Sequence, residues 1–227
     1  MADTADFRLL LTSGGISNEK LAQRLFDLGG KSPADTSLSV VPTASHIGPG
    51  DRSWLIDDLY RLKALGFKRI DIVDIAAIGK KQWLPRLEAA DILYFSGGNR
   101  YFLMECLNRS GLTLLLPRLL KTRVFVGTSG GSMVTGKTLG LKLSHTVLGD
   151  DRRTQDMEGL GYVDFHVVPH LGNPHFPRLE PKLVEAAIAG FPEKVYALDD
   201  HSAVQVVGGR VEVVGGGNWS LYQNRLG

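Results

Sequence analysis

The chain has 227 residues, of which 43% are hydrophobic and 22% are charged, and its formal net charge is +2. These values are typical of a globular α/β protein with a large core, and they favour a single domain over residues 1–227. The Lys and Arg residues are scattered along the chain, which argues against nucleic acid or an anionic membrane surface as a partner. The single cysteine, Cys106, excludes an internal disulfide and a multi-cysteine metal site.

No apolar run approaches the roughly 20 residues of a membrane span. The acidic start, Met1–Asp6, lacks the basic residues that open a signal peptide. A cytoplasmic location without membrane partners is therefore expected. The sequence leaves both a monomer and a homodimer open.

Along the first 126 residues, short apolar runs are separated by segments whose apolar residues have helical spacing. The runs do not alternate in polarity, which is typical of parallel strands buried on both faces. Strands are predicted at Phe7–Leu11, Leu38–Val41, Ile70–Val73, Ile92–Phe95 and Val124–Val126. Helices are predicted at Asn18–Leu28, from Asp51 or Ser53 to before Gly66, and at Trp83–Ala89, Tyr101–Leu107 and Leu112–Leu120.

The second part of the chain departs from this alternation. A polar, irregular segment at Leu141–Gly161 precedes a predicted strand, Val163–Val168, and a helix, Leu179–Ala189. Two alternating runs around Gly208-Gly209 then indicate a hairpin. We expect a three-layer α/β/α sandwich with a mostly parallel sheet and a C-terminal hairpin.

A small-residue loop with the pattern G-x-S-x-G, Gly127–Gly131, follows the fifth predicted strand. Where a strand turns sharply into a helix, the central residue is strained and its neighbours two positions away must be nearly free of side chain. The Ser129 hydroxyl would project from the tip of this turn, near helix N-terminal amides that stabilise negative charge. Ser129 is therefore a candidate nucleophile, although five residues alone fit a glycine-rich connection equally well.

A second glycine loop, Ser96–Asn99, follows the fourth predicted strand. Ligands bind such sheets beyond the carboxyl ends of the strands. Two glycines there expose backbone N–H groups, as an oxyanion hole requires. The amides of Gly98 and Gly130 could together hold a developing negative charge.

A serine nucleophile needs a base, and His170 directly follows a predicted parallel strand, at the same end of the sheet as Ser129. His175 is a rival for this role, and His166 inside the strand suits a structural role. Neither an H-E-x-x-H motif nor a cysteine pattern accompanies the three histidines, so no metal site is expected. The orienting acid is open: Asp150 or Asp151 could reach an imidazole from the long loop, and the alternatives are Asp164, Asp199 and Asp200.

With these residues assembled, the chain resembles the dipeptidase E and cyanophycinase family of serine peptidases. The similarity covers most of the length. It rests on Val41–Ser45, Leu65–Phe67, Tyr94–Asn99, Gly127–Ser132, Pro169-His170 and Leu198–Ala203. The resemblance implies a fold like the class I glutamine amidotransferases, with serine at the elbow where those enzymes use cysteine.

Carried over to this sequence, the resemblance implies Ser129 as nucleophile, His170 as base, and Gly98 and Gly130 as oxyanion donors. Asp150 or Asp151 is the nearest match to the family's acid. The usual family elbow is G-x-S-A-G, and Gly130 stands here in place of the alanine.

The family's dipeptidases prefer an N-terminal aspartate, for which Arg178 is a plausible partner and Asn99 and His175 are further substrate-binding candidates. The expected protein is a cofactor-free serine peptidase with a small peptide substrate, most simply an Asp-Xaa dipeptide. Cleavage of β-aspartyl-arginine bonds and a non-catalytic, small-molecule-binding role are the alternatives.

Overall fold

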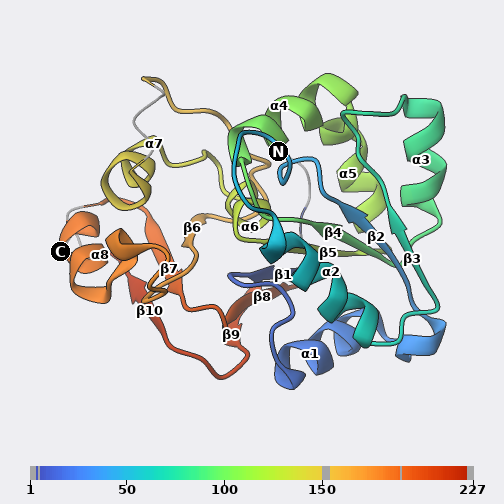
Figure 1. The fold of residues 1–227 in the computed structure, drawn as a ribbon, viewed down its shortest axis with the longest axis horizontal. Coiled ribbons are helices and arrows are strands. Elements are labelled where there is room, and N and C mark those ends of the chain that lie inside the picture. The colour runs from blue at the N-terminus through green and yellow to red at the C-terminus, as the bar shows by residue number, and fades with distance from the viewer. Residues whose placement is uncertain (1–3, 5, 150–153, 190, 224–227) are drawn as a thin grey trace.

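The computed structural model describes residue 4 and residues 6–149, 154–189 and 191–223. Its largest element is a seven-stranded sheet in the order β3-β2-β4-β5-β1-β8-β9 (Figure 1). The strands are β1 (Arg8–Thr12), β2 (Ser37–Val41), β3 (Arg69–Ile72), β4 (Ile92–Phe95), β5 (Val124–Thr128), β8 (Ala203–Val207) and β9 (Arg210–Val214). The first five are mutually parallel, and the β8–β9 hairpin pairs antiparallel to β1.

Helices cover both faces of this sheet (Figure 1). They are α1 (Glu19–Gly29), α2 (Ser53–Ala64), α3 (Lys80–Glu88), α4 (Arg100–Ser110) and α5 (Leu112–Leu120), with a 3-10 turn η1 (Pro33–Asp35) before β2. On one face Leu10 packs with α1 and α2 residues such as Leu25 and Leu62. On the other, Leu9 and Leu11 pack with residues of α3, α4 and α5. The predicted α/β architecture with a mostly parallel sheet is confirmed.

A smaller, three-stranded sheet lies beside the large one, in the order β10-β7-β6. Its strands are β6 (Phe165–Val168), β7 (Lys194–Leu198) and β10 (Trp219–Tyr222). The elements packed around it are α7 (Leu141–Leu143), a π-helical turn η2 (Ser144–Leu148), a 3-10 turn η3 (Pro177–Leu179) and α8 (Pro181–Ile188). The expectation that the strand before His170 belongs to the main sheet is therefore wrong, because β6 pairs with β7 instead.

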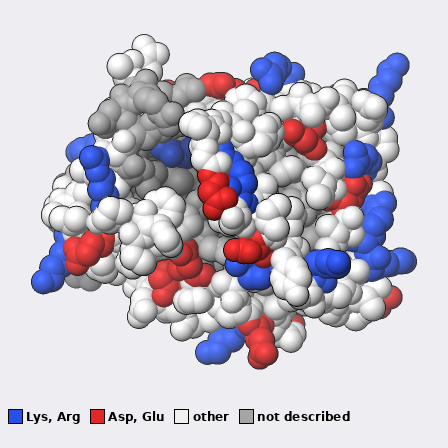
Figure 2. Space-filling view, in the orientation of Figure 1, with Lys and Arg blue, Asp and Glu red and all other residues white. Residues whose placement is uncertain are grey.

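The surface agrees with the nearly balanced charge. Figure 2 shows basic and acidic side chains interspersed over the face that it presents. None of the helices in the described part of the chain is long and apolar enough to cross a membrane.

Candidate active site

The G-x-S-x-G loop forms a sharp turn between β5 and the short helix α6 (Gly130–Met133). Ser129 has φ 49° and ψ −112°, a conformation that non-glycine residues rarely adopt. A Cβ atom on Gly127 would lie 2.5 Å from the Gly131 carbonyl oxygen, and one on Gly131 would lie 2.1 Å from the Phe95 carbonyl oxygen. Both glycines are therefore required by close backbone approach, and Ser129 stays partly exposed at the tip of the turn.

His170 lies against this serine, with its Nε2 atom 2.9 Å from Ser129 Oγ. The residue is itself left-handed, with φ 64°. Its backbone N–H donates to Ser13 Oγ over 2.7 Å, and Ser13 is the residue that follows β1. Two strained, non-glycine residues thus face each other across a hydrogen bond, which is common where backbone geometry serves a functional site.

Asp200 completes the chain of contacts, with Oδ1 2.6 Å from His170 Nδ1. The smaller sheet explains this contact. Asp200 follows β7 closely and His170 follows β6, and since β6 and β7 are parallel, both residues leave the sheet at the same edge. A carboxylate on Nδ1 favours the tautomer with a proton there, which leaves Nε2 free to accept the Ser129 hydroxyl proton.

The Asp200 carboxylate also accepts hydrogen bonds from Ser13 Oγ (2.8 Å) and Asn173 Nδ2 (2.5 Å). Partial burial raises the pKa of Asp200. The hydrogen bond and charge of His170 and the hydrogen bonds from Asn173 and Ser13 lower it more strongly, and the resulting pKa is about 2. The group is therefore an anion over the whole neutral range.

The other acidic candidates are placed differently. Asp150 and Asp151 lie outside the described residues. Asp164 is exposed and lies 3.7 Å from Lys194 Nζ. Asp199 holds the turn after β7 by accepting bonds from Ser202 Oγ and from the N–H groups of His201 and Asn218. Of the carboxylates that the structure describes, Asp200 is the one bonded to His170.

The two glycine loops touch each other beside Ser129. A Cβ atom on Gly97 would lie 3.2 Å from Ser129 Cβ, and one on Gly130 would lie 2.5 Å from the Gly98 carbonyl oxygen. Gly98 has φ 122°, and a Cβ atom there would lie 2.2 Å from the Ala44 carbonyl oxygen. Among the described residues, no acceptor is bonded to the N–H of Gly98 or Gly130, so both remain available for an oxyanion.

The three predicted substrate-binding residues have different local surroundings. Asn99 caps α4, since its Oδ1 accepts the Phe102 N–H, and its NH₂ group can donate to a ligand. His175 is exposed, and its N–H bonds to Asn173 Oδ1. Arg178 is exposed on η3, and its guanidinium lies 2.5 Å from the point where Gly149 would carry a Cβ atom.

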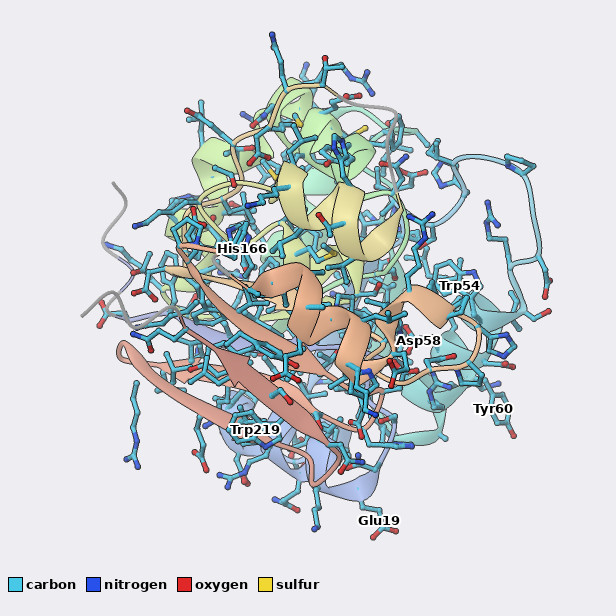
Figure 3. All side chains as sticks on the ribbon, turned by 90° about the vertical axis from the view of Figure 1, so that its left-hand side faces the viewer. Glu19, Trp54, Asp58, Tyr60, His166 and Trp219 are labelled. Atoms are coloured by element: carbon cyan, nitrogen blue, oxygen red, sulfur yellow. The ribbon has the colours of Figure 1, made fainter. Side chains whose placement is uncertain are left out.

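A buried polar chain runs behind the elbow. Asp58 on α2, only 3% exposed, accepts from Tyr94 Oη (2.8 Å), and Tyr94 Oη accepts from Thr128 Oγ1 (2.6 Å), next to Ser129. Arg61 lies 3.3 Å from Asp58. Burial raises the pKa of Asp58, against the lowering effect of Tyr94 and Arg61. Figure 3 shows Asp58 on the inward side of α2 and Tyr60 projecting away from it.

No group of three or more metal-ligating side chains occurs among the described residues. His166 is 8% exposed, stacks edge-on against Phe191, and has its pKa lowered by burial. These observations suit the structural role expected for it.

Three functional neighbours were not anticipated from the sequence: Ser13, Asn173 and Phe176. The Phe176 ring lies 4.5 Å from the His170 ring. The run Lys194–Leu198 alternates only in part between half-buried and buried residues, which is a weak strand signal, and the position of Asp200 depends on recognising it as β7.

The model of peptidase family S51 matches residues 9–214. The chain belongs to peptidase family S51. This S51 protein is therefore a serine-type peptidase. It is 26% identical over 171 residues to an uncharacterized peptidase of Pasteurella multocida (strain Pm70), covering 75% of this chain and 81% of that protein. An uncharacterized peptidase of Listeria monocytogenes (serovar 1/2a) is 26% identical over 151 residues, which cover 66% of this chain and 72% of the relative.

Solved structures show the same fold. A protein named for peptidase E from Listeria monocytogenes EGD-e superposes on this S51 peptidase with a TM-score of 0.73 at 22% identity, covering 91% of this chain and 97% of that one. A peptidase from an acI-B1 actinobacterium gives a TM-score of 0.66 at 19% identity, with 96% and 88% coverage.

Proposed function

We propose that this S51 peptidase hydrolyses short peptides, preferentially Asp-Xaa dipeptides, with Ser129 as nucleophile, His170 as general base and Asp200 as the orienting acid. The observation that carries the proposal is the continuous hydrogen-bond chain from Ser129 Oγ through both ring nitrogens of His170 to Asp200 Oδ1. Nucleophile, base and orienting group in this order are what acyl transfer requires. The carboxylate beside His170 argues against a non-catalytic role.

In the proposed reaction, Ser129 Oγ attacks the scissile carbonyl carbon while its proton passes to His170 Nε2. The tetrahedral intermediate collapses when the C–N bond breaks, and His170 returns the proton to the leaving amine. Water then attacks the acyl-enzyme, His170 takes its proton, and the proton goes back to Ser129 as the ester breaks. Asp200 stays ionised and stabilises the imidazolium.

The amides of Gly98 and Gly130 supply the oxyanion donors in this scheme. They lie on contacting loops on one side of Ser129, and neither amide bonds another described residue. Loss of one such donor in serine proteases costs about 10²–10³ in kcat.

The Asp-Xaa preference rests on the resemblance to dipeptidase E and on a cation near the centre. Arg178 is two residues beyond Phe176, which stacks on His170, and its exposed side chain can turn towards a substrate carboxylate. A β-aspartyl-arginine substrate has its β-carboxyl in the scissile bond and presents the α-carboxylate instead, so a matched panel of Asp-Xaa and β-Asp-Arg peptides separates the two activities.

The test of the nucleophile is labelling with a fluorophosphonate probe. Ser129→Ala should lose both labelling and dipeptide turnover. Ser132→Ala is the matched control, because this neighbouring hydroxyl is buried and bonded to the Thr12 carbonyl oxygen, and it should keep the label. Turnover in Ser129→Ala, or labelling elsewhere, would contradict the assignment.

A further inference from the structure

We propose that Ser13 is a positioning residue that fixes His170 and Asp200 relative to each other. The inference rests on the proposed Ser129–His170–Asp200 mechanism. Ser13 is fully buried at the carboxyl end of β1. Its hydroxyl accepts the His170 backbone N–H (2.7 Å) and donates to Asp200 Oδ1 (2.8 Å).

Each capacity of this hydroxyl has a distinct task. A serine hydroxyl has one proton to donate and lone pairs to accept with. The proton goes to the same carboxylate oxygen that bonds His170 Nδ1. With the donor direction fixed in this way, a lone pair faces the His170 N–H. One small side chain thus holds the backbone of the base and the carboxylate of the acid.

The backbone of His170 needs such an anchor. A φ of 64° is unfavourable for a residue with a side chain, so the surrounding contacts must hold it. Asn173 also contacts both residues, because its N–H donates to the His170 carbonyl oxygen and its side-chain NH₂ donates to Asp200 Oδ2. Asn173 lies on the same loop as His170, whereas Ser13 extends from a central strand.

The rigidity of β1 makes Ser13 the fixed point. β1 is paired on both sides, with β5 and β8. The Ser13 N–H bonds the Ser202 carbonyl oxygen (3.3 Å), and the Thr12 carbonyl oxygen accepts the Ser129 N–H (3.0 Å). Two consecutive residues at the end of one strand therefore contact all three members of the proposed triad.

The experiment measures the rate at which a fluorophosphonate probe labels Ser129. Ser13→Ala should slow labelling roughly ten- to a hundredfold, the range for losing a hydrogen bond to a charged group. Ser13→Cys fills the same space without a strong donor, so it should slow labelling similarly even if the alanine variant folds poorly. Melting curves establish that each variant is folded.

The matched control is Ser17→Ala. Ser17 Oγ also bonds Asp200, but at its backbone carbonyl oxygen (2.6 Å). This variant should label within about twofold of the wild-type rate. Equal slowing of labelling in Ser17→Ala and Ser13→Ala would overturn the proposal, because loss of any hydrogen bond to Asp200 would then have the same effect.

A double-mutant cycle distinguishes positioning from support. In an Asp200→Asn background, replacing Ser13 should slow labelling by a smaller factor than it does in the wild-type protein, because the carboxylate it orients is gone and its bond to the His170 N–H remains. Additive effects, or a wild-type rate in Ser13→Ala, would overturn the role of Ser13 alone. A wild-type rate in Asp200→Asn would instead overturn the proposed mechanism, and the role of Ser13 with it.

Discussion

The Phe176 ring stacks face to face on the His170 ring, with centroids 4.5 Å apart and planes inclined by 7°. Phe176 is 43% exposed, so the stack covers one face of the imidazole while its own outer face meets solvent. The proposed leaving amine takes its proton from His170 Nε2. We therefore expect Phe176 to contact the leaving residue.

Phe176→Ala should lower kcat/KM roughly three- to tenfold, because a stacked aromatic pair contributes about 0.5–1.5 kcal/mol beyond its buried area. Phe176→Tyr keeps the ring and should stay near wild type. The measurement is kcat/KM on Asp-Xaa dipeptides with small and large Xaa residues. Leu114→Ala, at an 84% exposed position on α5, is the control, and an equal loss there would contradict the stacking argument.

Asp200→Asn should lower kcat about 10⁴-fold, as expected when the group that fixes the histidine tautomer loses its charge. Asp199→Asn is the control within the same dipeptide. Asp199 bonds only turn groups, so its replacement should lower the melting temperature more than the activity of the folded protein. If the two variants exchanged these phenotypes, the acid would be misassigned.

The stability of the wild-type protein should depend on Asp200 at acid pH. Its pKa falls from 3.8 to about 2 on folding, so its contribution is present above pH 3.8 and is lost as the pH falls through about 2. The gap in unfolding free energy between wild type and Asp200→Asn should therefore narrow over this interval. Denaturant titrations at several pH values measure it, and a gap that widens on acidification would contradict the assignment.

Asp58→Ala should cost about 3 kcal/mol of unfolding free energy, because it leaves the buried Tyr94 hydroxyl without its acceptor and removes the carboxylate that pairs with Arg61. Asp57→Ala, its exposed neighbour on α2, should be nearly neutral. The contribution of Asp58 to the unfolding free energy should change with pH in the opposite direction to that of Asp200. Burial raises the pKa of Asp58 on folding, so its ionisation above pH 3.8 opposes the folded state. Denaturant unfolding of both variants gives the comparison.

The main sheet follows from sequence because its strands carry a local signal. Runs such as Ile92–Phe95 are buried along their whole length, and continuous apolar runs reveal such strands. Strand β7 alternates between buried and half-buried residues, and β10 is exposed or half-buried throughout. Both strands escaped prediction, and Asp200, the proposed acid that follows β7, was left among several alternatives for this reason.

The elbow itself was predictable, since close backbone contacts at Gly127 and Gly131 leave no room for side chains. The interpretation of Gly130 changes in one respect. The sequence predicts an oxyanion role for its backbone amide, and the structure adds a steric one, because a Cβ atom there would lie 2.5 Å from the Gly98 carbonyl oxygen. Alanine at this position would require the Gly98 loop to shift. A contact between loops more than 30 residues apart leaves no trace in a local pattern, and the same holds for Ser13.

The bond between Ser13 and Asp200 joins residues 187 positions apart. Closing so long a loop is entropically expensive, and long-range pairings of this kind form slowly. The parallel strands β1 to β5 come from the first 128 residues, so a nascent or cleaved chain that extends a few residues beyond them contains Ser129, the proposed nucleophile, but lacks both His170 and Asp200. Peptidase activity would thus appear only when the last third of the chain has docked, which keeps a partly folded peptidase from cutting peptides.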